Sequence, residues 1–240
     1  AVKNYPNEAR YVFQLGRAHL KKENFQVAFN LLNEAASKNY SIANYLLGLM
    51  SYYEDGNLGE YSYDFTISNF EKAKEIEYLL TEIDFYIAST NYWYGYYDKA
   101  IEKFLIIEKD MQFSERNWVL VELGASYYFL DDYENSKTYL DKLFTEDTFT
   151  EQEYYESNAF YYYAYVLSEF PEFYNKAIKY AEIHFSFLKN DESFDNENDD
   201  NFYYRQAVIL LGFLYEETEN LRKYVSLYEK ALIDDPSYYH

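Results

Sequence analysis

Four of the seven glycines in this 240-residue chain follow a leucine inside an apolar, helix-periodic stretch. The pairs are Leu15-Gly16, Leu47-Gly48, Leu123-Gly124 and Leu211-Gly212. Glycine inside a helix costs roughly 1 kcal/mol relative to alanine, so its recurrence at one helical position predicts that another backbone segment approaches closely there. The chain is therefore constrained to a repeated helical unit that packs tightly against a neighbour.

A second amphipathic segment follows each of these pairs, with small residues near its start and its end. In the first unit the small residues are Ala28 and Ala35. In the last unit, Tyr228 and Ala231 precede Pro236. This arrangement resembles the tetratricopeptide repeat, whose signature pairs Leu-Gly on a first helix with small and aromatic residues on a second helix and a proline at the end.

The other units vary this pattern. Ile87-Ala88 stands where Leu-Gly stands in the units above, and Ala164, Tyr165, Ala177 and Ala181 make a further unit with about one extra residue in its turn. The unit from Ala43 to Ala73 carries about six extra residues around positions 54–59, and in this it looks like a Sel1-like repeat, a longer relative of the tetratricopeptide repeat. The recurrence at intervals of about 32 to 47 residues carries the resemblance, which covers nearly the whole chain.

The resemblance implies an all-α fold, a right-handed superhelical solenoid of about six helix-turn-helix repeats in one domain covering residues 1–240. Each helix pair alone would expose one apolar face to water, so neighbouring pairs stack and bury these faces in a continuous core. The expected units are 8–40, 41–78, 80–112, 114–147, 150–190 and 202–236, with an acidic linker at 190–201. The expected helices are 8–21 with 24–37, 41–54 with 64–77, 81–94 with 97–109, 115–130 with 132–145, 151–169 with 172–189, and 202–217 with 220–234.

Composition narrows the possible partners. Lys plus Arg number 21 against 42 for Asp plus Glu, so the formal charge is -21. Such a surface repels a phosphate backbone, which makes nucleic acid and anionic membrane poor partners. No apolar run approaches the roughly eighteen residues of a membrane helix, so membrane insertion is not expected. The three prolines and seven glycines are too few turn formers for a β-sandwich or barrel.

The first helix of each pair is expected to line a concave groove in which a protein or peptide binds. Tyrosine and tryptophan provide rigid contact area at low entropy cost, which makes them frequent in binding hot spots. Trp93 and Trp118 are the leading candidates. The predicted partner-binding residues are Arg10, Arg17, Tyr45, Tyr86, Tyr92, Trp93, Trp118, Tyr128, Tyr161 and Tyr165, and the neighbouring groove positions are Lys21, Tyr52, Phe85, Phe129 and Tyr162.

Two alternatives stay open for these residues. An aromatic stripe at helical spacing is also typical of a buried core, and the cations of the first helix also fit a solvated surface. A carboxylate clamp of the kind that grips chaperone tails is not predicted, because Phe13 and Leu46 stand where its polar residues are expected.

No catalytic or metal site is predicted. His19, His184 and His240 are scattered, and the chain has no cysteine, so neither a zinc set nor a nucleophile with its base can be assembled from sequence spacing. The carboxylates of 190–201 could bind calcium, but the segment lacks the glycine and closing glutamate of a calcium loop and is better interpreted as a linker. We therefore expect no enzyme activity and no cofactor.

Three functions fit these observations: a non-catalytic protein-interaction scaffold, a bacterial peptide-sensing regulatory domain, and an exported Sel1-like protein acting at a cell envelope or host surface. The scaffold is the leading hypothesis. Localisation and oligomeric state are left open, because the chain begins at Ala1 and its composition fits a cytoplasmic and an exported protein equally well.

Overall fold

The computed structural model describes residues 8–59, 61–109, 115–146, 149–150, 153–154, 158–190 and 201–234. Across these residues the chain forms twelve α-helices and two short 3-10 helices, and no strand occurs among them. Internal contacts divide the chain into two compact units, Ala1–Val119 and Leu120–His240. The single-domain organisation expected from the sequence stays a prediction, and each unit is described by itself.

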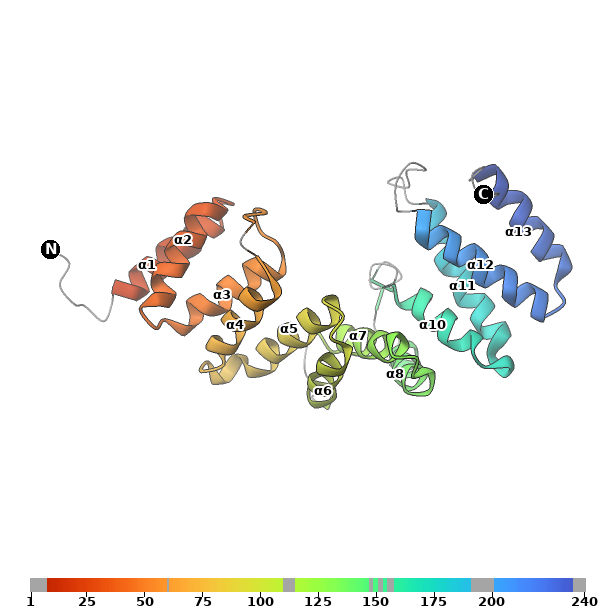
Figure 1. Cartoon of the computed structure of the whole chain (residues 1–240), viewed down its shortest axis with the longest axis horizontal. Helices are drawn as coiled ribbons and strands as arrows, with labels where there is room; N and C mark the ends of the chain where they lie inside the picture. Colours follow the sequence, from red (N-terminus) through yellow and green to blue (C-terminus); the bar gives the residue numbers. More distant parts are fainter. Residues whose placement is uncertain are drawn as a thin grey trace. The chain divides into compact units, whose positions relative to one another are not determined.

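The first unit is a run of antiparallel helix pairs (Figure 1). Within it α1 packs on α2, α3 on α4 and α5 on α6, while α2 contacts α3 and α4 contacts α5. Its elements are α1 (Glu8–Leu20), α2 (Phe25–Ser37), α3 (Ser41–Tyr52), α4 (Tyr63–Ala73), η1 (Glu77–Leu79), α5 (Leu80–Trp93), α6 (Tyr97–Ile107) and the first residues of α7 (Arg116–Phe129).

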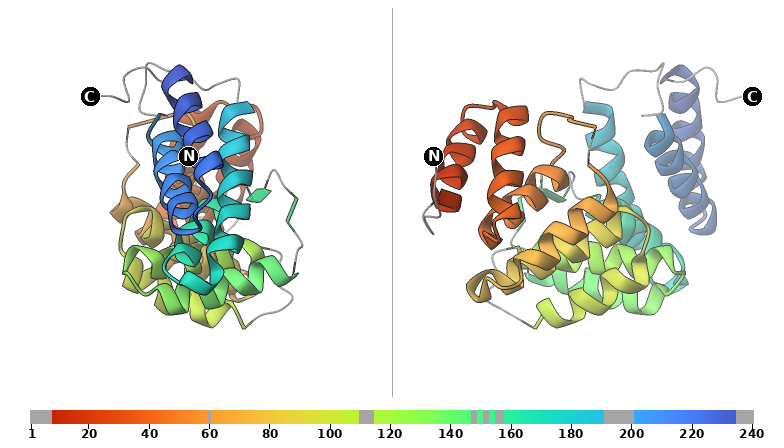
Figure 2. Two further views of the ribbon diagram at one scale, coloured as in Figure 1. Left: turned by 90° about the vertical axis from the view of Figure 1, so that its right-hand side faces the viewer. Right: turned by 60° about the vertical axis from the view of Figure 1, so that its left-hand side comes forward.

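The second unit repeats this organisation. Helix α10 packs on α8 and α11, α11 on α12, and α12 on α13, and Figure 2 shows the last three running alongside one another. Its elements are the rest of α7, α8 (Tyr133–Glu146), α10 (Ala159–Ser168), η2 (Pro171–Phe173), α11 (Tyr174–Asn190), α12 (Asn201–Glu217) and α13 (Leu221–Asp234).

The all-α prediction and the helix-turn-helix repetition are confirmed, with one helix wrong in extent. A continuous helix over 151–169 was expected, whereas α10 begins at Ala159. The residue before it, Asn158, has a φ of 55°, in the left-handed region that asparagine tolerates better than most residues and that a helix cannot continue through. Thr150 and Glu153 form a capping box, since the Glu153 amide donates to Thr150 Oγ1 at 3.2 Å and the Thr150 amide donates to Glu153 Oε2 at 2.8 Å. Residues 191–200 of the expected linker, and Pro236, lie outside the described residues.

The repeated glycines make room for a side chain and not, as the sequence suggested, for a backbone. A Cβ atom on Gly48 would lie 2.7 Å from the Phe70 ring, and one on Gly124 would lie 2.7 Å from Leu140 Cγ. Gly16 faces Leu32 in the same way, and Gly212 faces Tyr228. Each of these partners lies on the second helix of the same pair. The partner is 16 residues downstream of its glycine in three units and 22 in the second unit, which matches the six extra residues of its turn.

Gly124→Ala is therefore expected to destabilise the second unit by about 1 to 3 kcal/mol, although alanine is the better helix former. The cause is overpacking, because the new methyl group collides with Leu140, which is fully buried. Urea unfolding followed by circular dichroism measures the change. The Leu140→Ala background should remove the collision, so a double-mutant cycle that returned additive effects would contradict this explanation.

The turn inside the helix pairs also repeats. A residue with positive φ follows α1, α5, α7 and α12, and the amide after it donates to a carbonyl five residues back, as in a Schellman motif. These bonds are Asn24 to His19, Tyr96 to Asn91, Asp132 to Tyr127 and Asn220 to Tyr215, with lengths of 2.8 to 3.0 Å. Glycine occupies the positive-φ position only at Gly95 among these four, which explains how so few glycines suffice for a repeat protein.

Tyrosine joins successive helix pairs in both units. Tyr45 of α3 donates to Glu82 of α5 at 2.5 Å, and Tyr215 of α12 donates to Glu182 of α11 at 2.6 Å. Tyr163 of α10 likewise bonds Asp141 of α8. A buried ring thus fills the core while its hydroxyl is paired with a carboxylate. The pairing gives the tyrosine-rich, acidic composition a structural role.

Candidate protein-binding site

An aromatic groove of about 450 Å³ opens in the first unit where the C-terminal ends of α3 and α5 meet α4. We define the aromatic groove by its lining residues: Ser51, Tyr52, Glu54, Thr66, Thr90, Trp93 and Tyr94. Trp93 is 68% exposed although its neighbours on α5 are buried, so a large apolar ring stands free at the edge of a concave surface. An exposed ring beside a groove is typical of a protein-binding site.

The polar groups in the floor of the groove are already paired within the protein. Ser51 and Thr66 share a buried hydroxyl hydrogen bond of 2.6 Å. Thr90 donates its hydroxyl to the Tyr86 carbonyl at 2.6 Å. Because these hydroxyl donors are used internally, the rings of Tyr52, Trp93 and Tyr94 are left as the contact surface for an apolar side chain of a partner.

The rings around the groove are fixed by other rings behind them. Tyr52 packs edge-on against Tyr86 with centroids 5.1 Å apart, and Tyr86 stacks on buried Phe70 at 5.4 Å. Next to Tyr94, the ring of Tyr63 lies with its centroid 5.3 Å from that of the Tyr94 ring. Tyr63 also donates to Asn91 Oδ1 at 3.0 Å. This support means that the groove is preformed, which lowers the entropy cost of binding.

The tyrosines behind the groove stay neutral through the physiological pH range. Burial, and then the hydrogen bond with Tyr53, raise the pKa of Tyr86 above its ordinary value of 10.0. Burial, and then the hydrogen bond to Glu82, raise the pKa of Tyr45 in the same way. Among the described residues that line the groove, Glu54 is the one carboxylate.

The predicted binding residues of the first unit take different positions relative to the aromatic groove. Trp93 lines the aromatic groove, and Tyr86 supports it from behind through Tyr52. Tyr45 and Tyr92 are each 8% exposed and contribute packing, with Tyr92 edge-on against Trp93 at 5.3 Å. The remaining three are exposed Arg10 and Arg17 on α1, and half-buried Trp118 on α7, none of which lines this groove.

In the second unit the structure brings three predicted residues together. The ring centroid of Tyr128 of α7 lies 5.7 Å from that of Tyr165 of α10, and the ring centroid of Tyr161 lies 5.5 Å from that of Tyr165. Tyr161 is buried, whereas Tyr128 and Tyr165 are half-buried. Their role in binding stays a prediction, since this cluster is equally a part of the packing between α7 and α10.

Sequence reasoning missed Tyr94 and the threonines of the aromatic groove. Tyr94 lies just after α5, outside the helical positions that were projected onto the chain, and Thr66 belongs to a second helix. A signal was present in the aromatic run from Tyr92 to Tyr97, which exceeds what one buried helix face can hold. Among the described residues, no helix is both long and apolar enough to cross a membrane, and no group of His, Asp and Glu is arranged to hold a metal ion.

Known structures share this fold. No model of a protein family matches the sequence, and no curated protein sequence matches it. PilF of Pseudomonas aeruginosa superposes with a TM-score of 0.65 and 18% identity over 96% of this chain and 93% of that chain. The MamA protein superposes with a TM-score of 0.57 and 18% identity over 80% of this chain and 90% of that chain. Both are tetratricopeptide-repeat proteins, and the chain has the tetratricopeptide-repeat fold.

Proposed function

We propose that this chain is a non-catalytic protein-interaction scaffold that binds a polypeptide segment in the aromatic groove. The exposed Trp93 ring beside a groove with preformed walls is the observation that supports it most. The helical-repeat fold, which PilF and MamA share, supports a scaffold role in general. The paired hydroxyls of the floor favour a segment that inserts an apolar or aromatic side chain between Tyr52 and Trp93.

Trp93→Ala is expected to weaken capture of such a segment by about 30-fold, which corresponds to the roughly 2 kcal/mol typical of a hot-spot residue. The melting temperature should stay nearly constant, because the ring is 68% exposed and removing it opens no core cavity. Trp93 and Trp118 are the two tryptophans, so a Trp118→Phe background leaves Trp93 as the sole tryptophan. Titration with a library of aromatic-containing peptides should then shift its emission to shorter wavelength.

Tyr78→Ala is the matched control, since Tyr78 is 82% exposed in the same unit and does not line the aromatic groove. It should leave both capture and stability unchanged. If Trp93→Ala lowered the melting temperature strongly, Trp93 would belong to the core and the proposal would fail. It would also fail if no peptide of the library changed Trp93 emission.

A further inference from the structure

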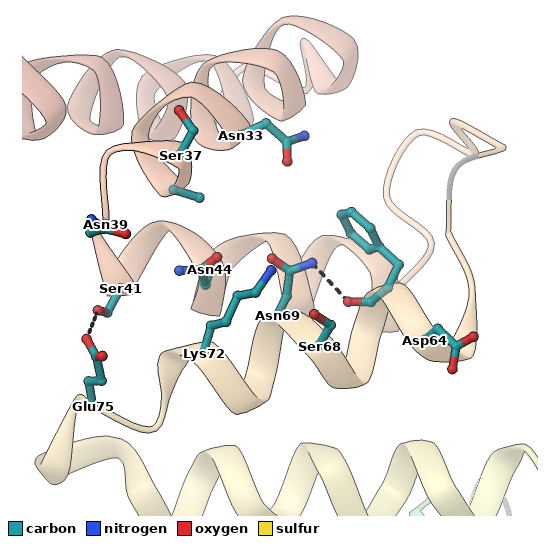
Figure 3. Close-up of a pocket in the computed structure, with 12 residues that line it drawn as sticks. Asn33, Ser37, Asn39, Ser41, Asn44, Asp64, Ser68, Asn69, Lys72 and Glu75 are labelled. Carbon is teal, nitrogen blue, oxygen red and sulfur yellow. Dashed lines mark hydrogen bonds between the residues drawn. The ribbon is translucent and has the colours of Figure 1, made fainter.

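Inside each unit, the first helix of one pair packs on the second helix of the preceding pair. Helix α3 packs on α2 in this way, α5 on α4, and α12 on α11. Figure 3 shows one such contact beside a polar groove, where α3 lies between α2 and its own partner α4. Every contact of this kind joins two different faces, one on a second helix and one on a first helix.

The joining face of a first helix is recognised by its distance from the repeated glycine. It consists of the residues five and one before the glycine and two after it. In α3 these residues belong to one core cluster with Ala28 and Phe29 of α2. In α3 and α12 the face is fully buried, and its residues are Ala43, Leu47, Met50, Ala207, Leu211 and Leu214. In α1 the same positions hold Tyr11, Leu15 and Ala18, which are exposed and which we call the α1 face.

The joining face of a second helix includes the residues nine and thirteen after the glycine. In α2 these residues are Phe25 and Phe29. Phe29 is buried because its ring packs on that of Phe65 in α4, with centroids 5.7 Å apart. In α13 the same positions hold Leu221 and Val225, and both side chains are more than half exposed.

Helix α12, the partner of α13, adds a third exposed residue. Ile209 stands three residues before its glycine and is exposed, whereas Phe13 of α1 and Tyr45 of α3 stand at the same distance from theirs and are buried. The next pair covers these two rings. The centroid of Phe13 lies 5.1 Å from that of Tyr40, and the centroid of Tyr45 lies 6.5 Å from that of Tyr86 in α5. We call Ile209, Leu221 and Val225 the α13 face.

The α1 face and the α13 face are the two halves of one interface. End repeats of a solenoid usually turn a polar surface to water, because an apolar end makes the array associate. Here both ends keep apolar side chains at the positions that internal pairs bury. The α1 face matches the face that α3 turns to α2, and the α13 face matches the face that α2 turns to α3. A second copy of this chain supplies the partner that each face lacks.

The distribution of charge favours the same contact. The whole chain has a formal charge of -21, so two copies repel each other over most of their surface. Helix α1 has two arginines and one glutamate, and α13 has three basic and two acidic residues. Each end helix therefore has a formal charge of +1, and the acidic excess lies outside both.

We infer that the α1 face of one copy binds the α13 face of another, so that the stacking of helix pairs continues from one molecule into the next. Such a head-to-tail contact leaves one free face on each side of a dimer. The assembly therefore grows beyond two copies until it closes into a ring or extends as a filament. Trp93 belongs to neither face, so the inference does not depend on the aromatic groove.

Two variants of the full chain, Tyr11→Glu and Val225→Glu, each block one face. Both side chains are more than half exposed and glutamate is the better helix former, so both variants should fold. In sedimentation velocity between about 10 μM and about 1 mM, the unchanged chain should form species larger than a dimer. Each variant alone should associate at least about tenfold more weakly, because a carboxylate is buried against apolar side chains.

Mixing the two variants tests the direction of the contact. Each variant keeps one intact face, so an equal mixture should form a one-to-one complex and nothing larger. An α1 to α1 or α13 to α13 contact would instead let one of the variants associate by itself as strongly as the unchanged chain, and that result would overturn the inference. It would also be overturned if the unchanged chain stayed monomeric over the whole concentration range.

Two controls separate this contact from other sources of association. Tyr78→Glu adds the same charge to an exposed ring of η1 and should leave association unchanged. Added salt should strengthen association, because it screens the repulsion between acidic chains, whereas a contact made by ion pairs would weaken. Trp93→Ala should associate as the unchanged chain does. Loss of association in this variant would assign self-association to the aromatic groove and would overturn the inference.

Discussion

Phe70→Ala is expected to lower the free energy of unfolding of the first unit by about 3 to 5 kcal/mol, the cost of a large cavity in a packed core. Phe70 is fully buried, its ring fills the space that Gly48 leaves open, and Tyr86 stacks on it with an interplanar angle of 5°. Both tryptophans, Trp93 and Trp118, belong to this unit, so urea unfolding followed by tryptophan fluorescence reports it directly.

The same substitution should also impair the aromatic groove, because Tyr86 loses its support and in turn supports Tyr52. Peptide capture is expected to fall even under conditions where the variant stays folded. Tyr78→Ala again serves as the reference. Because Tyr78 is exposed, this substitution is expected to change the free energy of unfolding by no more than about 0.5 kcal/mol. If Phe70→Ala lowered the free energy of unfolding by less than about 1 kcal/mol, the stability of the second helix pair would not depend on this ring.

Acidification should destabilise the second unit through His184. Burial lowers the pKa of His184 from 6.5 to about 4, and the ring lies 5.6 Å from that of Tyr161. Between these two pH values the unfolded chain takes up a proton that the folded chain does not, so stability falls as the pH falls. The contribution is absent above about pH 7, accumulates down to about pH 4 and amounts to roughly 3 kcal/mol.

His184→Phe isolates this contribution, because phenylalanine keeps an aromatic ring at this position and does not titrate. Unfolding free energies of both proteins are measured by circular dichroism from pH 7 to pH 4. Carboxylates titrate in both proteins, so the difference between the two curves reports the histidine alone. That difference should change steadily as the pH is lowered through this window, and parallel curves would rule out a buried, neutral His184.

The helix pairs were predictable because their signals are local. The recurrence of Leu15-Gly16, Leu47-Gly48 and their counterparts marks one helical position, and hydrophobic periodicity marks the face around it. The reason for the glycines was not local. Phe70 is separated from Gly48 by a turn of variable length, and whether a side chain or a backbone fills the space depends on how deeply the paired helix packs.

The identity of the binding rings was only partly predictable. Tyr92 and Trp93 are consecutive on α5, yet one is 8% and the other 68% exposed. Successive helical residues point about 100° apart, and tyrosine is equally suited to a core and to a surface, so composition does not tell which ring is free. The predicted set therefore contains residues of the groove and residues of the core together.

The sequence by itself determined an all-helical repeat with a strongly acidic surface, because propensity, periodicity and turn chemistry act over one or two helical turns. Only the tertiary structure decided where the free surfaces lie. The sequence gives no signal that separates Asn44 from any other polar helix residue, and Asn44 becomes a largely buried residue beside a groove only once α2 and α4 pack on either side of α3. Burial depends on neighbours distant in the chain, and this is the information that a local pattern lacks.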